Sequence, residues 1–287
     1  MIRTLNKYLS LVKFSHTIFA LPFALIGFFL AIRTGDAEFS LSTFLLVLVC
    51  MVMARSAAMA FNRYIDREFD ALNPRTVVRE IPSGQISPKA ALALVIISSL
   101  IFMTATYFIN PLCFYLSPVA LLVVLGYSFT KRFTPLCHLI LGMGLALAPI
   151  GAYIALTSQF AVLPIIFSVI VFFWVSGFDI IYALQDDEFD RSQKLKSIPV
   201  YLGRKNALLL SRAFHVMVVM LLSLAYLYGP FGKYYLIGAV LFTGLLIYQH
   251  TLVKPNDLSK VNLAFGTTNG IASVAFSVFV CMDIYFS

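Results

Sequence analysis

Long apolar stretches alternate with short polar segments along the whole chain. Each stretch has about 18–24 residues, the length that one helix needs to cross the hydrocarbon layer of a membrane. Helices and closed barrels satisfy their backbone hydrogen bonds in lipid, and runs of this length favour helices. The pattern therefore predicts an all-α, polytopic membrane protein with nine transmembrane helices. We expect them at residues 14–32, 40–61, 89–109, 112–130, 137–157, 161–182, 206–228, 234–253 and 262–285.

Breaker residues mark several ends of these predicted helices. Asn110-Pro111 indicates a tight turn between two spans. Ser87-Pro88 is typical of an N-cap followed by proline at the first helical position. Residues 14–32 are long enough to span a membrane and lack a small-residue cleavage site. We therefore interpret them as the first membrane helix and not as a signal peptide.

The composition agrees with a membrane location. Hydrophobic residues make up 60% of the chain and charged residues 12%, and the mean hydropathy is +0.90. A soluble domain of 287 residues would need more polar surface than this. The four cysteines and four histidines are scattered, so the sequence shows no zinc-site spacing and no Ser-His-Asp order.

Lysine and arginine collect on one face of the predicted topology. The N-terminus and the loops after the second, fourth, sixth and eighth spans share that face, whereas the opposite face carries Arg33 and Lys233. By the positive-inside rule the basic face is cytoplasmic. Contact with anionic lipid accounts for the net charge of +8, so no nucleic-acid partner is implied. We expect an integral protein of the bacterial cytoplasmic (inner) membrane.

Two acidic segments lie on the basic face and share a spacing. Asn62, Asp66 and Asp70 follow the second span at intervals of four residues, so they line one side of a continued helix. A similar stripe ends the sixth span and consists of Asp179, Tyr182, Asp186 and Asp190. Facing carboxylates at a low-dielectric boundary repel one another, and a divalent cation removes this cost. Mg²⁺ suits carboxylate oxygens and completes its shell with water and phosphate.

Basic residues surround these acids on the same face. They are Arg75, Arg79, Lys131, Arg132, Lys194 and Lys196. Arginine matches phosphate oxygens bidentately and lysine acts as a point charge, so acids and bases together predict a metal–diphosphate site. Two simpler interpretations stay open. The acids could pair with neighbouring bases in ordinary solvated loops, or the bases could contact lipid headgroups.

Arg55 lies inside the second span, seven residues before Asn62 and on the same helix face. An arginine within a membrane helix is a functional candidate. It is a candidate to bind the phosphate of one substrate or the carboxylate of a second, anionic substrate. The alternatives are snorkelling to the interface or pairing with a buried acid such as Asp179.

At these residues the chain resembles the UbiA-type intramembrane aromatic prenyltransferases, in particular the 4-hydroxybenzoate polyprenyltransferase-like branch. The family's first signature, Asn-Asp-x-x-Asp-x-x-x-Asp followed by arginines and Pro-x-Gly, is similar to NRYIDREFDALNPRTVVREIPSG. The second signature matches DIIYALQDDEFDRSQKLKS. The loop YSFTKRFT resembles a further family motif, with Ser128 in place of proline. Arg63 replaces the usual second residue of the first signature, which leaves the number of metal ions open.

The resemblance implies a single transmembrane prenyltransferase domain, residues 1–287, whose helices surround a central cavity open to the cytoplasmic face. It implies transfer of a polyprenyl group from a polyprenyl diphosphate to a small aromatic acid in ubiquinone or menaquinone biosynthesis. The acceptor would be 4-hydroxybenzoate or 1,4-dihydroxy-6-naphthoate. Mg²⁺ would be the cofactor, and the protein would lie in the lipid bilayer. No obligate protein partner is evident.

The resemblance also implies a role for each candidate residue. The expected Mg²⁺ ligands are Asp66, Asp70, Asp186 and Asp190. The expected substrate-binding residues are Arg55, Arg75, Arg79, Lys131, Arg132 and Lys196. Arg55 would take the acceptor carboxylate. Asn62 would donate a hydrogen bond or act as a ligand beside the metal. Asp179 or Tyr182 would remove the proton from the ring of the aromatic acceptor.

Two other membrane-protein classes are alternatives. A cation-coupled transporter would place its acids near the bilayer midplane, whereas these collect at one rim. A phosphatidyltransferase acting on CDP-alcohols would carry one continuous Asp-rich run and not two separated segments. Within the prenyltransferase family, haem, chlorophyll and archaeal lipid acceptors also remain open.

Overall fold

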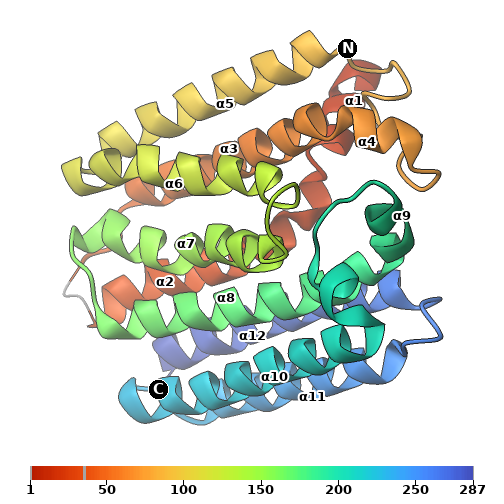
Figure 1. The fold of residues 1–287 in the computed structure, drawn as a ribbon. Helices are drawn as coiled ribbons and strands as arrows, with labels where there is room; N and C mark the ends of the chain where they lie inside the picture. Colours follow the sequence, from red (N-terminus) through yellow and green to blue (C-terminus); the bar gives the residue numbers. More distant parts are fainter. Residues whose placement is uncertain (1, 35–36, 287) are drawn as a thin grey trace.

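The computed structural model describes residues 2–34 and 37–286, with the side chains of all but 2–5 and 14–16. The elements of this part of the chain are helices, as the sequence predicts. The long ones are α3 (Leu41–Ile65), α5 (Pro88–Ile109), α6 (Pro111–Thr130), α7 (Cys137–Thr157), α8 (Val162–Ala183), α10 (Ile198–Tyr228), α11 (Lys233–Leu252) and α12 (Asn269–Phe286). They lie alongside one another in one bundle (Figure 1).

Eight helices in the described part of the chain are long and apolar enough to cross a membrane. They correspond to the last eight predicted spans. The first predicted span, residues 14–32, is divided instead into a 3₁₀ helix, η1 (Phe14–Phe19), and α2 (Leu21–Thr34). The 14 residues of α2 are fewer than one full crossing needs, so the count of nine is not confirmed. Helix α2 still packs within the bundle, against α7 and α12.

The helix ends follow the turn chemistry of the sequence. Ser87 Oγ accepts a hydrogen bond from the Ala90 N–H at 3.2 Å, and Pro88 takes the first helical position of α5, as predicted. Asn110 ends α5 and begins α6, because its side-chain oxygen accepts from the Cys113 N–H at 2.8 Å. Because each cap ends or begins a helix within one or two residues, the connection between the adjacent antiparallel helices α5 and α6 is very short.

Helices α3 and α8 each continue past a bend into a short helix at the same end of the bundle. Helix α4 (Arg67–Leu72) follows α3, and a 3₁₀ turn, η2 (Leu184–Asp186), leads from α8 into α9 (Asp187–Ser192). Figure 1 shows α4, α9 and the N-terminal α1 (Ile2–Leu11) at the end of the bundle that carries the N label, whereas the C label lies at the other end. Both acidic segments therefore lie at one end of the molecule.

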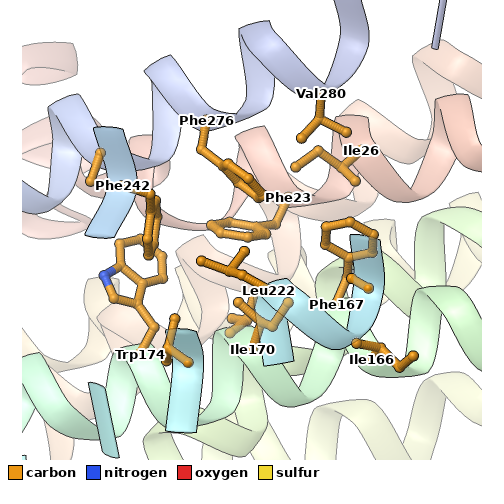
Figure 2. Close-up of a cluster of buried hydrophobic side chains, with 14 of the residues drawn as sticks. Phe23, Ile26, Ile166, Phe167, Ile170, Trp174, Leu222, Phe242, Phe276 and Val280 are labelled. Carbon is orange, nitrogen blue, oxygen red and sulfur yellow. The ribbon is translucent and has the colours of Figure 1, made fainter. Parts of the chain in front are cut away.

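Aromatic packing around α8 holds one half of the bundle together. Trp174 on α8 is fully buried and lies among Phe23 of α2, Phe242 of α11 and Phe276 of α12 (Figure 2). The ring centroids of Phe23 and Phe242 lie 5.3 and 5.5 Å from that of Trp174, in the range of favourable aromatic contacts. This core fixes the helix from which the second acidic segment extends.

A π-helical turn, η3 (Leu263–Thr268), leads into α12. Such turns leave carbonyl groups without their usual helical partners and often occur at functional sites. Here buried amides supply the missing bonds: Gln249 Nε2 donates to Ala264 O at 2.9 Å, and Asn269 Nδ2 donates to Ala264 O at 3.0 Å and to Phe265 O at 2.9 Å. The turn brings the Phe265 side chain to the cavity described next.

Candidate active site

One cavity of about 550 Å³ lies at the end of α3 and α8, between these helices and the loops that follow them. Of the predicted site residues and the bases around them, all but Lys194 and Lys196 line it: Arg55, Asn62, Asp66, Asp70, Arg75, Arg79, Lys131, Arg132, Asp179, Tyr182, Asp186 and Asp190. Lys196 is exposed and its ammonium donates to Phe133 O at 3.1 Å. The geometry therefore gives no support to a substrate-binding role for Lys196.

The first acidic segment is a helix with one bend. Asp66 lies at the bend between α3 and α4, with φ −89° and ψ 5°. Backbone bonds continue through it, since the Asp66 N–H donates to Asn62 O at 2.9 Å and the Asp70 N–H donates to Asp66 O at 2.8 Å. Asp186 lies at a similar bend before α9, with φ −108° and ψ 2°. Both segments thus turn their carboxylates toward one cavity by the same backbone device.

Arg75 joins the two acidic segments. Its Nε and Nη2 donate to the two carboxylate oxygens of Asp186 at 2.9 and 2.5 Å, a bidentate arrangement, and its Nη1 donates to Tyr182 Oη at 3.1 Å. Asn73, which the sequence reasoning missed, also donates to Asp186, at 3.1 Å. The loop after the first segment is therefore bonded directly to the second segment.

Each of the four aspartates expected to bind metal forms an ion pair with one of the expected phosphate-binding bases. The pairs are Asp66–Arg132 at 3.2 Å, Asp70–Arg79 at 2.6 Å, Asp186–Arg75 at 2.5 Å and Asp190–Lys131 at 2.7 Å. The simpler interpretation, that the acids pair with neighbouring bases, is thus partly correct. The pairs do not lie in solvated loops, however, because three of these aspartates are buried in the cavity wall.

Burial and neighbouring charges act together on the pKa of two groups at the mouth of the cavity. The pKa of Asp66 is raised above its usual 3.8 by burial and by the nearby Asp70 carboxylate, against the opposing effect of Arg132. At Lys131 burial acts to lower the pKa, but the Asp190 carboxylate outweighs it and the pKa rises. The bases present do not fully stabilise the Asp66 carboxylate, and a bound cation would.

The carboxylates suit a divalent cation that takes few protein ligands. Oδ2 of Asp70 is buried and accepts no hydrogen bond from the residues that the structure describes, and the buried Asp190 carboxylate is balanced by the Lys131 ammonium at 2.7 Å. Among those residues, no three Asp, Glu, His or Cys side chains form a ready-made metal cluster. An ion would therefore take one or two carboxylates from each segment and complete its shell with water and substrate oxygens, as Mg²⁺ does.

Arg55 lies where the charged cavity meets a second, apolar one. The second cavity, of about 340 Å³, lies between α3, α5, α6 and α7, and Arg55 and Tyr127 line both cavities. Arg55 Nε is buried without a hydrogen-bond partner in the described part of the chain. Asp179, the alternative partner considered from sequence, is bonded to His138 instead. The Arg55 guanidinium is therefore available to an anionic substrate group.

Two residues that the sequence reasoning missed complete the cavity wall beside α8. His138 Nδ1 lies 2.7 Å from Asp179 Oδ2, and the Phe265 ring stacks on the Tyr182 ring with centroids 4.1 Å apart. They come from α7 and from the π turn, so no sequence spacing relates them to α8. In the sequence, His138 is a histidine near the start of a predicted helix and Phe265 is one aromatic residue among many. Neither feature is specific enough to predict a place in the site.

The fold and the site define a polytopic helical membrane protein with a charged cavity at one end of its bundle. The model of the UbiA prenyltransferase family matches residues 20–277. The chain therefore belongs to the UbiA prenyltransferase family, which confirms the resemblance seen in the sequence.

Relatives and solved structures cover most of the chain. A 4-hydroxybenzoate octaprenyltransferase from Aeromonas hydrophila is 29% identical over 85% of this chain and 84% of its own length. One from Francisella tularensis subsp. mediasiatica is 30% identical over 82% of each chain. The apo structure of a UbiA homolog from Aeropyrum pernix K1 matches with a TM-score of 0.81 at 32% identity, over 94% of this chain and 97% of that one. A UbiA homolog from Archaeoglobus fulgidus, solved bound to DMAPP and Mg²⁺, shares the fold with a TM-score of 0.74 at 21% identity. The match covers 98% of this chain and 100% of that one.

Proposed function

We propose that the protein transfers a polyprenyl group from a polyprenyl diphosphate to a small aromatic acid within the membrane. The observation that carries this proposal is one cavity with two ends: four paired aspartates at the mouth, and the unpartnered Arg55 about 16 Å deeper along α3 than Asp66, beside an apolar chamber. A diphosphate, an apolar chain and a carboxylate each have a matching surface there. The names of the curated relatives support the same reaction.

The bases at the cavity mouth are arranged to exchange partners when a donor binds. Mg²⁺ would be held by Asp66, Asp70, Asp186 and Asp190, with Asn62 beside them, and would supply the positive charge that stabilises a departing diphosphate. Arg75, Arg79, Lys131 and Arg132 then donate to phosphate oxygens in place of the carboxylates. The Archaeoglobus fulgidus homolog is bound to DMAPP and Mg²⁺, which supports a prenyl diphosphate and Mg²⁺ as the ligands of this site.

The cavity wall next to the diphosphate suits an allylic cation. Such a cation needs dry surroundings with aromatic faces. The stacked rings of Tyr182 and Phe265 offer these faces, and the hydrogen bond from Arg75 to Tyr182 Oη links them to the leaving-group site. Bond cleavage and stabilisation of the cation would therefore occur at adjacent groups.

The acceptor would bind deeper, between Arg55 and the rings. Arg55 holds its carboxylate, which leaves the ring facing the allylic carbon. Asp179 is the better proton acceptor of the two candidates, because a phenol oxygen is a weaker base than a carboxylate and Tyr182 Oη already accepts a hydrogen bond from Arg75. The proposed location is the bacterial inner membrane with the site toward the cytoplasm, on the strength of the basic residues at that end.

Product identification tests this proposal. Membranes containing the protein are incubated with Mg²⁺, a prenyl diphosphate, and either 4-hydroxybenzoate or 1,4-dihydroxy-6-naphthoate, and the products are identified by mass. The proposal predicts a prenylated product from one acceptor, and none in EDTA. The acceptor that reacts is thereby assigned. Folded protein that gives no product from either acceptor contradicts the proposal.

A further inference from the structure

We infer that His138 is a positioning residue that holds Asp179 in place as the proton acceptor. The inference rests on the proposed function, in which Asp179 takes the proton from the acceptor ring. His138 lies in the first turn of α7, is only 3% exposed and lines the cavity together with Asp179 of α8. Its Nδ1 lies 2.7 Å from Asp179 Oδ2, the distance of a strong, charge-assisted hydrogen bond.

The opposite side of the imidazole determines where its proton lies. The Ile198 N–H, at the start of α10, points to His138 Nε2 at 3.4 Å. It is one of the N–H groups that have no partner within their own helix. Nε2 is therefore the acceptor, and the ring proton lies on Nδ1 and is directed at Asp179.

Close packing of α7 on α8 holds the imidazole in this position. Gly142 lies one turn after His138, and a Cβ there would lie 2.3 Å from Ser176 Oγ and 2.6 Å from Phe172 O. Ser176 Oγ also donates to the His138 backbone carbonyl at 3.3 Å. The two helices thus touch directly beside the pair, and the imidazole has little freedom to move away from the carboxylate.

The pair leaves one carboxylate oxygen of Asp179 for the substrate. The His138 bond engages Oδ2, and the Asp179 side chain is 20% exposed and lines the cavity. After the carbon–carbon bond forms, the reacting ring carbon carries the prenyl group and a hydrogen. Oδ1 takes that proton, the electrons of the C–H bond restore the aromatic ring, and Asp179 becomes a neutral acid that later returns the proton to solvent. The His138 bond to Oδ2 keeps Oδ1 directed at the ring.

Kinetics with a ring-deuterated acceptor test this role. We expect His138→Leu to lower kcat by about 10- to 100-fold with little change in the acceptor KM, since misaligned catalytic groups lose rates of this order. Proton removal then becomes the slow step, so a primary deuterium isotope effect on kcat is expected. His138→Gln, whose amide can donate from a similar position, should recover part of the rate.

His215→Gln is the matched control. His215 is also buried and bonded, to His250 at 2.8 Å, but it does not line the cavity. It should keep the wild-type kcat and isotope effect. A wild-type kcat in His138→Leu overturns the inference, as does a lowered kcat without an isotope effect. If His138→Leu does not fold, the same measurement is made on His138→Gln. A lowered kcat with an isotope effect supports the inference, and a lowered kcat without one overturns it. A wild-type protein without turnover would instead overturn the proposed function.

Discussion

At the scale of single residues, Asp190 and Asp187 are close neighbours with opposite expected roles. Asp190 lines the cavity and is 1% exposed, and its carboxylate pairs with Lys131, a base that also lines the cavity, at 2.7 Å. Asp187 does not line the cavity, and its carboxylate accepts two bonds from Arg204 at 2.7 and 2.8 Å. Substituting each residue in turn therefore tests the proposed metal site against a structural ion pair.

We expect Asp190→Asn to lower kcat by at least about 10²-fold, because it removes a metal ligand from the diphosphate site. Its thermal unfolding temperature in detergent should fall, because the substitution also removes the ion-pair partner of Lys131 at 2.7 Å, so turnover is compared per amount of folded protein. Asp187→Asn should keep turnover and lose about 1–2 kcal/mol of stability with its bonds to Arg204. The reverse pattern would place the metal ligand at Asp187.

Arg55 gives a second prediction at this scale. Arg55→Leu should raise the KM for the acceptor by about tenfold or more, because a bidentate bond to its carboxylate is lost, and leave the KM for the donor unchanged. Arg55→Lys should give an acceptor KM between those of the wild type and Arg55→Leu, since lysine keeps the positive charge but cannot form the bidentate hydrogen bond. Steady-state kinetics with each substrate varied in turn measure both values. A rise in the donor KM alone would assign Arg55 to the diphosphate.

At the scale of elements, most helices could be predicted because hydrophobic length alone marks a membrane crossing. The predicted span 137–157 coincides with α7, and the cap at Ser87 and the turn at Asn110-Pro111 also follow from sequence. Residues 14–32 were predicted as one helix because hydropathy does not distinguish a 3₁₀ turn from an α-helix. In the structure Lys13 takes a left-handed conformation, with φ 46°, and α2 begins only at Leu21.

The acidic stripes were predictable because each lies within one segment of regular spacing. The partners of those stripes were not. His138 reaches Asp179, and Asn73 reaches Asp186, only because separate helices pack together. The π turn is likewise invisible in the sequence, since its signal is a backbone geometry and not a residue pattern.

The π turn carries a prediction at this scale. Asn269 is fully buried, accepts from Trp174 Nε1 at 2.9 Å and donates to two carbonyls of the turn. Asn269→Leu should lower the free energy of unfolding by about 1–3 kcal/mol, because it leaves these groups unpaired, and also lower kcat as Phe265 moves from Tyr182. Phe265→Leu keeps the hydrogen bonds and should mainly lower kcat. Wild-type turnover in Asn269→Leu would show that the turn does not position Phe265.

At the scale of the whole molecule, the bundle has one charged end, which we expect to face the cytoplasm. Single cysteines introduced in a background without the four native ones report on this. Ser192→Cys, at the end of α9, should react with an impermeant thiol reagent only from the cytoplasmic side. Ser158→Cys, in the turn after α7, should react only from the opposite side. Labelling of both from one side would contradict the topology.

The central claim is that two distant acidic segments hold one diphosphate through Mg²⁺. Calorimetric binding of a non-hydrolysable geranyl thiolodiphosphate to the purified protein tests it most directly. We predict binding that needs Mg²⁺ and that weakens about tenfold or more in both Asp66→Asn and Asp190→Asn, because each segment contributes ligands. Equal affinity in EDTA, or a loss in one variant but not in the other, would contradict the account.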